Sequence, residues 1–600
     1  MRWQQRLILL GSALALTAAG AAAAPSPAIA DPVAANTDTA VGMKPMMGFN
    51  NWARFTCSAQ ARLDGTSTGY SFQQFMEDQA KAMKDTGLVA AGYTNLTVDD
   101  CWMQRTSSGY LHGASTWGSR SQPGFDFELT AYANFVHNQS MLAGLYTTSG
   151  VNTCQGVAAG IMGHEQADAN SLAYWGIDSL KVDNCGTDSS NRQAELTKVA
   201  NALKTATTGS SRKILLNESA PAGFGPSSSG KYDAMNYVRG LGQMWRASPD
   251  IAVWHPSPAN AWDWPHGSDY YEGGVYQNFT DTVALARYDA PGDFGDADML
   301  LIGDNNQLTL PEQRSQFALW AAMGSPLEIS TDVRKMAADP TGYAPQLNIL
   351  KNNDIIAVDQ DALGAGGYLA SRDNVSATAG IDVVVKPLAN GGRAVVVLNK
   401  NAAATTYTLD LGRAGFGNLS CPRTARNLWS HTSQNVTASI TATIASHDNA
   451  MYTITPGSCG AALPTAQIQA AQTGFQKPAL CLDAYHGATA GTKVALYACT
   501  GGGNQQWVRQ AGGLISSYAA PSLCISADTS GAQLAICNSA DAKQVWTYHR
   551  SGSLSQGNGT CLDVHGGDVG DAASTVATYA CGTNQPNQAW SAPFGTPPAA

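Results

Sequence analysis

The last quarter of the chain repeats itself three times, and this repetition limits the possible folds more than any other feature. Each copy begins with a cysteine and ends with the motif Gln-x-Trp, in which x is any residue. The opening cysteines are Cys481, Cys524 and Cys561, and the closing tryptophans are Trp507, Trp546 and Trp590. Repeats of about forty residues stack on their neighbours to bury a shared core. Residues 465–593 are therefore expected to form one module with three related parts.

The threefold motif resembles the β-trefoil carbohydrate-binding module of the ricin B-chain type. The resemblance implies that each sugar binds against an aspartate, an aromatic ring two residues before the second cysteine, and an asparagine near Gln-x-Trp. The first repeat matches with Asp483, Tyr497 and Asn504, and the third with Asp563, Tyr579 and Asn587. A ring can stack on the apolar face of a pyranose while the carboxylate and amide bind its hydroxyls. We expect both repeats to bind sugar, with polysaccharide as the partner.

The middle repeat lacks these groups, because Ser526, Ala535 and Lys543 stand at the matching positions. We interpret this repeat as structural only. In the alternative interpretation, the matching residues of all three copies merely pack the module.

The N-terminus has the layout of a secretory signal over residues 1–30. Arg2 and Arg6 precede an apolar run at positions 7 to 23, and Ala-Ile-Ala at 28–30 offers small residues for cleavage. No later stretch approaches the ~20 uninterrupted apolar residues that span a bilayer. We expect a secreted, extracellular protein rather than one held by a transmembrane anchor.

The charge balance excludes two classes of partner. The chain has 35 Lys and Arg against 45 Asp and Glu, a net charge of −10. Such a balance offers no basic surface for phosphate backbones or anionic lipid heads. We therefore expect neither nucleic acid nor a membrane surface as partner.

The cysteine count is even, with 12 in the chain. An oxidising compartment converts an even set into disulfides. No pair has the CxxC spacing of zinc ribbons, so six bridges are favoured over a metal site. Proximity within the repeats favours Cys481–Cys499, Cys524–Cys537 and Cys561–Cys581, although sequence alone does not fix the connectivity.

Between residues 43 and 358, short apolar runs alternate with longer helical patterns, which is the order of βα units around a parallel sheet. The expected strands are 46–50, 93–98, 142–146, 179–182, 213–217, 243–246, 296–302 and 327–330. These units predict a closed (β/α)₈ TIM barrel. Residues 359–460 alternate apolar and polar positions and predict an antiparallel β-sandwich domain.

The ends of these expected strands are rich in carboxylates, and chemistry in such a barrel sits where strands end. Asp99 and Asp100 follow one strand, Asp183 another, and Asp250 and Asp298 lie near two more. Burial and like charges raise some carboxyl pKa values, while a nearby Lys or Arg keeps others low. This separation supplies an acid and a base. Beside a sugar-binding module, it indicates glycoside hydrolysis by two carboxylates.

Five segments, in consistent order, resemble family 27 glycoside hydrolases, the α-galactosidase family. They are Gly48-Phe49-Asn50-Asn51-Trp52, Asp99-Asp100-Cys101-Trp102, Leu180-Lys181-Val182-Asp183-Asn184-Cys185, Trp245-Arg246-x-x-x-Asp250 and Asp296-x-Asp298-Met299-Leu300. The resemblance implies a retaining mechanism. In it, Asp183 attacks the anomeric carbon, and Asp250 first protonates the leaving oxygen and then deprotonates water.

The same resemblance implies which groups hold the sugar. Asp99 and Asp100 would bind the 4- and 6-hydroxyls of galactose, with Lys181 near the 3- and 4-hydroxyls. The other substrate-binding candidates are Trp52, Trp102, Tyr146, Cys185, Glu218, Arg246, Asp298 and Met299. Glu218 is expected to bind a free 2-hydroxyl. Barrel packing is the alternative for the tryptophans, and a structural salt bridge for Lys181 or Arg246.

The family's two barrel disulfides match Cys57–Cys101 and Cys154–Cys185, which would clamp the mouth of the barrel. Cys421 with Cys459 would close the β-sandwich. An insertion at residues 254–279, rich in Trp, His, Tyr and Gly, is expected to form a lid or an extra sugar subsite.

Together these features predict a secreted, exo-acting α-galactosidase. A β-L-arabinopyranosidase is the close alternative, because that sugar is α-galactose without its C6 group, and an isomalto-releasing enzyme acting on α-1,6-glucan is a third. An alternative from a different functional class is a non-catalytic lectin with an inactive barrel. No metal or organic cofactor is expected, since two acids and water suffice for the reaction.

Overall fold

The computed structural model describes residues 41–591 with internal gaps. The gaps are residues 59–60, 119–126, 157, 159, 226–227, 256–259, 264–271, 306, 373–375, 417–418, 460–464, 471–479, 486, 500–501, 550–551, 568–572 and 583–584. The expected signal sequence at 1–30 lies outside the described residues, as does part of the 254–279 insertion. Among the helices of the described ranges, none has the length and apolar character needed to cross a bilayer.

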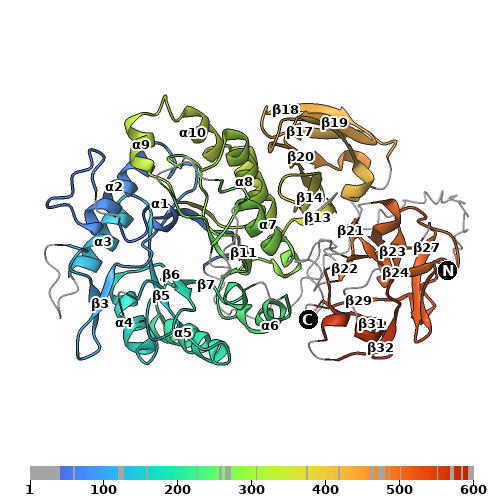
Figure 1. The fold of residues 1–600 in the computed structure, drawn as a ribbon, viewed down its shortest axis with the longest axis horizontal. Coiled ribbons are helices and arrows are strands. Elements are labelled where there is room, and N and C mark those ends of the chain that lie inside the picture. Colours follow the sequence, from blue (N-terminus) through green and yellow to red (C-terminus); the bar gives the residue numbers. More distant parts are fainter. Residues whose placement is uncertain are drawn as a thin grey trace, which may run out of the picture.

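The first module is an eight-stranded parallel sheet in the order β11-β8-β7-β6-β5-β2-β1-β12. Its strands are β1 (Met47–Asn50), β2 (Asn95–Thr97), β5 (Leu142–Thr148), β6 (Ser179–Asp183), β7 (Leu215–Glu218), β8 (Met244–Arg246), β11 (Phe294–Asp296) and β12 (Leu327–Ile329). A parallel bridge from Leu300, just after β11, to Ile329 of β12 closes the sheet. The expected (β/α)₈ barrel is confirmed (Figure 1).

Helices cover the outside of this sheet. They are α1 (Trp52–Phe55), α2 (Phe72–Asp85), α3 (Phe127–Asn138), α4 (Glu165–Trp175), α5 (Arg192–Ala206), α6 (Ser228–Val238), α7 (Val275–Val283), α8 (Leu310–Met323), α9 (Val333–Ala338), α10 (Ala344–Leu350) and α11 (Asn353–Asp359). Two short pairs of strands accompany them, β3 (Met103–Arg105) with β4 (Leu111–Gly113) and β9 (Asp250–Ile251) with β10 (Glu272–Gly273).

The expected strand at 296–302 is wrong in its bounds, because β11 ends at Asp296. Asp298 has a φ of 71°, and its N–H donates to Oδ1 of Asp296 at 2.7 Å. A positive φ does not continue a strand. The chain therefore turns at the barrel mouth, and this turn presents the Asp298 carboxylate there.

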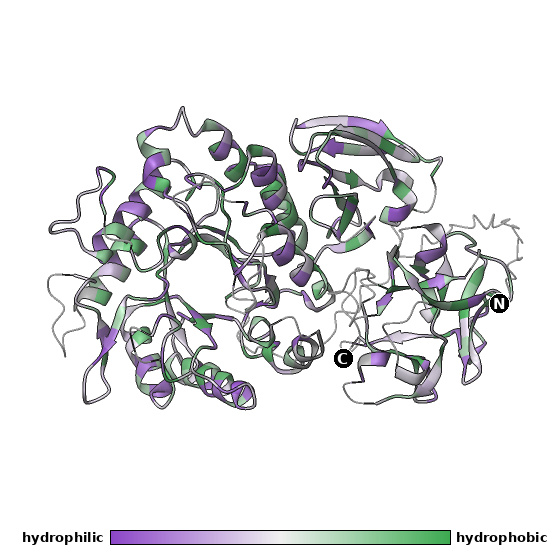
Figure 2. Cartoon of the chain, viewed as in Figure 1, coloured by the Kyte–Doolittle hydropathy of each residue, from purple (hydrophilic) through white to green (hydrophobic). Residues whose placement is uncertain are grey.

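Helix α8 is buried on nearly all sides, although a surface helix usually has one polar face. A capping box at Thr309 and Glu312 starts it, and the apolar half that follows, green in Figure 2, lies between the barrel and the next module. Contacts to β12 of the barrel and to β14, β15 and β20 of the next module bury the helix beyond its first turn. The first two modules therefore share a core.

The second module is a pair of antiparallel sheets, ordered β13-β14-β15-β20-β17-β18 and β16-β19. The strands are β13 (Tyr368–Arg372), β14 (Ile381–Pro387), β15 (Arg393–Asn399), β16 (Thr405–Asp410), β17 (Arg423–Asn427), β18 (Thr432–Val436), β19 (Ser439–Ile444) and β20 (Asn449–Thr455). In β14 and β15, Val384 and Val396 join the barrel core while Val383 and Val395 join the sandwich core. Side chains alternate across a strand, so burial of both faces explains the valine runs.

The third module contains short strands. They are β21 (Thr465–Gln467), β22 (Gln469–Ala470), β23 (Leu480–Ala484), β24 (Lys493–Ala498), β25 (Gln506–Arg509), β26 (Ile515–Ser517), β27 (Leu523–Asp528), β28 (Gly531–Ile536), β29 (Thr547–Tyr548), β30 (Leu554–Ser555), β31 (Thr560–Val564), β32 (Val576–Ala580) and β33 (Trp590–Ser591). In each repeat, the closing tryptophan donates its indole N–H to the carbonyl of the residue after the opening cysteine. These bonds are Trp507 to Leu482 at 3.0 Å, Trp546 to Ile525 at 3.1 Å and Trp590 to Leu562 at 2.9 Å. The repeated motif is thus an internal clamp of the trefoil.

Five of the expected disulfides are present. They are Cys57–Cys101, Cys154–Cys185, Cys481–Cys499, Cys524–Cys537 and Cys561–Cys581. Cys421 is also disulfide-bonded, but the side chain of its expected partner, Cys459, lies outside the described residues.

The trefoil docks on the β-sandwich. The Tyr518 hydroxyl donates to Oδ2 of Asp410 at 2.9 Å, and Nε2 of Gln506 donates to the Ala370 carbonyl at 2.7 Å. Core residues of the two modules, including Leu411 and Trp507, belong to one apolar cluster. The barrel, sandwich and trefoil therefore pack in series (Figure 1).

The docking contact predicts a stability effect. Tyr518→Phe removes the hydroxyl that bonds Asp410 and should cost about 1 kcal/mol of stability, lowering the Tm of the transition that includes the trefoil by a few degrees. Differential scanning calorimetry measures this shift. An unchanged thermogram would show that the hydrogen bond contributes nothing to docking.

Candidate active site

Charged side chains from four strands gather at the mouth of the barrel. Asp99 and Asp100 follow β2, Lys181 and Asp183 lie on β6, Arg246 ends β8, and Asp298 follows β11. All of them are buried. Parallel strands present their C-terminal ends on one side of a barrel, so residues far apart in the sequence meet there.

Asp183 is surrounded by groups that favour its ionised form. Ser219 and Tyr146 donate hydroxyl hydrogen bonds to its carboxylate, and Nζ of Lys181 lies 3.8 Å from Oδ2. Burial alone would raise the pKa of Asp183, but Lys181, Arg246 and the hydroxyls outweigh it and lower this pKa below its usual 3.8. Asp183 is therefore an anion suited to nucleophilic attack.

Asp250 has the opposite character. Its side chain is 35% exposed, and Oδ1 lies 2.6 Å from Nη2 of Arg246. Partial desolvation of the carboxyl group by the walls of the site raises its pKa to about 6 against the opposing charge of Arg246, and the negative charge of Asp183 adds to the rise. Below pH 6 this group holds a proton that it can donate.

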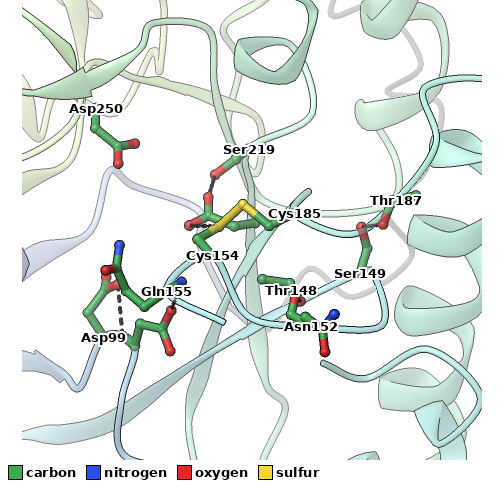
Figure 3. The surroundings of a disulfide bond; sticks show 12 residues. Asp99, Thr148, Ser149, Asn152, Cys154, Gln155, Cys185, Thr187, Ser219 and Asp250 are labelled. Carbon is green, nitrogen blue, oxygen red and sulfur yellow. Dashed lines mark hydrogen bonds between the residues drawn. A yellow bond between two sulfur atoms is a disulfide. The ribbon is translucent and has the colours of Figure 1, made fainter. Parts of the chain in front are cut away.

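One guanidinium nitrogen links the two carboxylates. Nη2 of Arg246 is 3.6 Å from Oδ1 of Asp183 and 2.6 Å from Oδ1 of Asp250. The sum of the two distances is the upper limit for the separation of these oxygens. This limit is shorter than the ~6.5–9.5 Å separation of inverting glycosidases. This upper limit excludes the inverting spacing and admits the ~5–5.5 Å of a retaining pair. In Figure 3, the Asp250 side chain points into the space beside Ser219, Asp99 and the Cys154–Cys185 bridge.

A second cluster lies deeper in the mouth. Oδ2 of Asp99 accepts hydrogen bonds from Nζ of Lys181 at 2.7 Å and from Nδ2 of Asn50 at 2.8 Å. The Lys181 ammonium also lies over the Tyr146 ring, 5.3 Å from its centroid. Lys181 and Asp183 share one face of β6, so one strand links this cluster to the nucleophile.

Asp100 and the two disulfides form the rim. Oδ2 of Asp100 accepts the Gln155 N–H at 3.0 Å, and burial raises the pKa of Asp100. Cys101 and Cys185 each belong to a bridge, and Sγ of Cys154 lies 3.9 Å from Oδ2 of Asp183. The bridges therefore tie the segments that carry Asp100 and Asp183.

Asp298 supports Arg246 from the far side. Its Oδ2 lies 3.5 Å from Nη1 of Arg246 and accepts the Ile251 N–H at 2.7 Å. Asp298 thus holds both the arginine and the strand that begins with Asp250. Met299 follows it in the chain and is buried.

Of the tryptophan candidates, Trp52 lies beside the mouth on α1, where its backbone N–H donates to Oδ1 of Asn50 at 2.9 Å. The structure does not bring Trp102 to the carboxylates, which corrects its placement at the sugar. Its indole N–H donates to the Tyr146 carbonyl at 3.0 Å, and its ring packs edge-on against Trp117 and Trp175. Trp102 is a core residue.

The structure also corrects the role expected for Glu218. In β7 it lies opposite Val182, whereas Asn217 lies opposite Lys181, so Glu218 points out of the barrel. It is fully buried, and among the residues that the structure describes neither carboxyl oxygen has a hydrogen-bond partner. Burial, with the nearby charge of Asp293, raises the pKa of Glu218 well above its usual value, so its position in the barrel wall favours the uncharged form.

Ser219 is the functional residue that sequence reasoning missed. It follows Glu218 and points inward, where its hydroxyl binds Asp183. Strand alternation predicts its inward position. In Asn217-Glu218-Ser219 the first and third side chains lie on one face, as they do in Lys181-Val182-Asp183 on the neighbouring strand.

The trefoil residues form two equivalent clusters. Oδ2 of Asp483 accepts Nδ2 of Asn504 at 2.9 Å, and Tyr497 beside it is 43% exposed. Gln505, from the closing motif, donates to the same aspartate oxygen at 2.8 Å. A second ring, Tyr485, lies 6.1 Å from Tyr497, centroid to centroid.

The third repeat repeats this geometry. Oδ2 of Asp563 accepts Nδ2 of Asn587 at 2.8 Å and Nε2 of Gln588 at 2.9 Å, with Tyr579 64% exposed. In the middle repeat, Lys543 instead pairs with Asp528 at 2.9 Å. The exposed rings beside fixed carboxylates are therefore a feature of the first and third repeats.

Three family models match the chain. They are alpha galactosidase A over residues 44–361, the alpha galactosidase C-terminal beta sandwich domain over 378–454 and the ricin-type beta-trefoil lectin domain over 472–590. In the described residues, no group of His, Cys, Asp and Glu is arranged to hold a metal ion.

Relatives with the same description cover most of the chain. Alpha-galactosidase A of Aspergillus niger is 32% identical over 519 residues, which is 85% of this chain and 86% of that protein. Alpha-galactosidase of Oryza sativa is 31% identical over 422 residues, 70% of this chain and 86% of that protein. The crystal structure of alpha-galactosidase I from Mortierella vinacea matches with a TM-score of 0.57 at 25% identity, covering 70% of this chain and 98% of that one. The chain belongs to the α-galactosidase family, family 27 of the glycoside hydrolases.

Proposed function

We propose that the protein is a retaining exo-α-galactosidase that removes terminal α-D-galactosyl residues from oligosaccharides or polysaccharides. The observation that carries this proposal is the pair of carboxyl groups on one arginine nitrogen with opposite pKa shifts. Asp183 is held ionised and Asp250 is held protonated up to about pH 6. Retaining hydrolysis requires this division of roles.

The reaction follows from the positions of these groups. Asp183 attacks the anomeric carbon while Asp250 gives its proton to the leaving glycosidic oxygen, and a galactosyl ester forms on Asp183. Once Asp183 is esterified, Arg246 retains Asp250 and Asp298 as its anionic partners. Asp250 then takes a proton from water, which attacks the same carbon and frees Asp183.

Specificity rests on the deeper cluster together with Asp100 of the rim. Asp99, Lys181 and Asp100 offer acceptors and a donor for ring hydroxyls, and the family resemblance assigns them to the 3-, 4- and 6-hydroxyls of galactose. A β-L-arabinopyranoside presents the same ring without C6, so it competes for this site. Groups that bind the 4- and 6-hydroxyls leave no room for a further sugar on those oxygens, which favours attack on terminal residues.

The trefoil supplies a second mode of contact with the substrate. We place polysaccharide on the Tyr497 and Tyr579 sites, where rings stack on pyranoses and fixed carboxylates bind hydroxyls. Disulfides in the barrel and in every trefoil repeat are typical of an oxidising compartment. The protein therefore acts outside the cell on galactose-bearing glycans.

The catalytic assignment predicts that Asp183→Ala lowers kcat on 4-nitrophenyl α-D-galactoside by about 10⁴-fold or more, because no ester can form. Initial rates on this substrate and on 4-nitrophenyl β-L-arabinopyranoside, with one preparation, decide the preferred sugar. Proton NMR should show α-galactose as the first product. Retained turnover in the variant, or β-galactose appearing first, would defeat the mechanism.

The pH profile is a second prediction. kcat/KM should fall as pH rises through about 6, where Asp250 loses its proton, and should fall at low pH where Asp183 gains one. Ser219→Ala removes a hydrogen bond to the Asp183 carboxylate, so the acid limb should move to higher pH. Ser219→Thr keeps a hydroxyl and serves as the control. An acid limb identical in all three proteins would exclude Ser219 from tuning Asp183.

The trefoil assignment is tested separately. Tyr497→Ala and Tyr579→Ala should each weaken binding to galactomannan about 3- to 10-fold, since ring stacking is worth ~0.5–1.5 kcal/mol. Affinity electrophoresis measures the retardation, and hydrolysis of the nitrophenyl substrate should not change. Lys543→Ala, at the matching asparagine position of the middle repeat, is the control. Unchanged retardation in the double tyrosine variant would leave the trefoil without this role.

A further inference from the structure

The acid–base residue is held by a strand outside the barrel sheet. Asp250 begins β9, which pairs in parallel with β10, so that Asp250 lies opposite Glu272. The Ala252 N–H also donates to the Gly273 carbonyl at 3.0 Å. The position of Asp250 therefore depends on whatever fixes β10.

Strand β10 runs directly into α7, and α7 grips the loops that carry the catalytic groups. Nδ2 of the fully buried Asn278 donates to the Pro249 carbonyl at 3.1 Å and to the Ala297 carbonyl at 3.2 Å. Pro249 precedes Asp250, and Ala297 precedes Asp298. One side chain of α7 thus holds the backbone next to both Asp250 and Asp298, the two carboxylates that contact Arg246.

Helix α7 is in turn anchored to the β-sandwich. The Tyr276 hydroxyl donates to Oδ2 of Asp382, on β14, at 2.8 Å and accepts from Nζ of Lys400 at 3.1 Å. Lys400 and Asp382 form an ion pair at 2.8 Å, and both side chains are fully buried. Well-packed apolar residues would serve stability as well as a buried ion pair does. Its directional contacts, by contrast, fix the rotation and depth of α7.

A second anchor holds the segment before β10. The Trp262 indole N–H donates to the Ala377 carbonyl of the sandwich at 2.9 Å, and the ring stacks on His447 at 5.6 Å between centroids. The Trp262 carbonyl accepts the Tyr276 N–H at 3.1 Å. Both anchors therefore meet at the start of α7.

We propose that the β-sandwich is a positioning element for the acid–base step, acting on Asp250 through Tyr276, α7 and Asn278. The inference rests on the proposed function and assigns a catalytic role to a module that supplies none of the catalytic groups described above. Tyr276 and Asn278 are positioning residues. Proton transfer tolerates little drift of the donor, so a shift of α7 should impair the acid step more than the attack by Asp183.

The test uses the leaving group. A dinitrophenolate leaves without protonation, whereas methanol must be protonated by Asp250. In Tyr276→Phe, which keeps the ring but lacks the hydroxyl, kcat/KM on methyl α-D-galactoside should fall about 10-fold, and on 2,4-dinitrophenyl α-D-galactoside less than about 2-fold. Asn278→Ala should show the same selectivity through a different contact, which keeps the test decisive if one variant does not fold.

Tyr518→Phe is the matched control, because it also removes a tyrosine hydroxyl that bonds an aspartate at a module boundary. It should lower Tm while leaving both kcat/KM values unchanged. Equal losses on both substrates in Tyr276→Phe and Asn278→Ala, or no loss, would overturn the positioning role alone. A wild-type protein inert on both galactosides would instead defeat the proposed function, and the inference with it.

Discussion

The active site depends on the ion pairs that the buried guanidinium of Arg246 makes. The guanidinium contacts Asp183, Asp250 and Asp298, three carboxylates that could not share one mouth if each were a bare anion. Burial would lower the pKa of Arg246, but these partners raise it well above its usual value, so the charge is permanent. Arg246 lowers the pKa of both catalytic carboxyl groups, so it does not by itself separate them. Lys181 and two hydroxyls lower the pKa of Asp183 further, whereas desolvation and the charge of Asp183 raise that of Asp250, and the two groups therefore differ in protonation state.

The barrel interior below this site is also polar, which is uncommon for a packed core. Thr97 donates to Glu328 at 3.1 Å, and Asn217 donates to Asp296 at 2.7 Å. Burial, aided by the charge of Asp296, raises the pKa of Glu328 to about 8. This group is therefore neutral at the pH at which Asp250 can donate its proton. Its neutrality avoids a further negative charge beneath Lys181 and Arg246, which stay available to Asp99, Asp183 and Asp250.

The modules are linked by shared surfaces. Helix α8 is buried because barrel and sandwich cover opposite sides of it, and β14 and β15 are buried for the same reason. The trefoil then docks on the sandwich through Tyr518 and Gln506. The sandwich is therefore central, in contact with the helix beside Asp250 on one side and with the trefoil on the other.

The sequence by itself determined the order of modules, the barrel, and most of the groups at its mouth, because strand periodicity, repeats and strand-end carboxylates are local signals. It misplaced the strand at 296–302, where the chain turns at Asp298 with a positive φ. It also took Trp102 and Glu218 for sugar contacts, whereas Trp102 packs in the core and the neighbour of Glu218, Ser219, faces the mouth. Only the tertiary structure decided which side of each strand faces the mouth and which carboxylate keeps its proton. Those outcomes depend on distances between charges from separate strands, and such distances exist only once the sheet has closed.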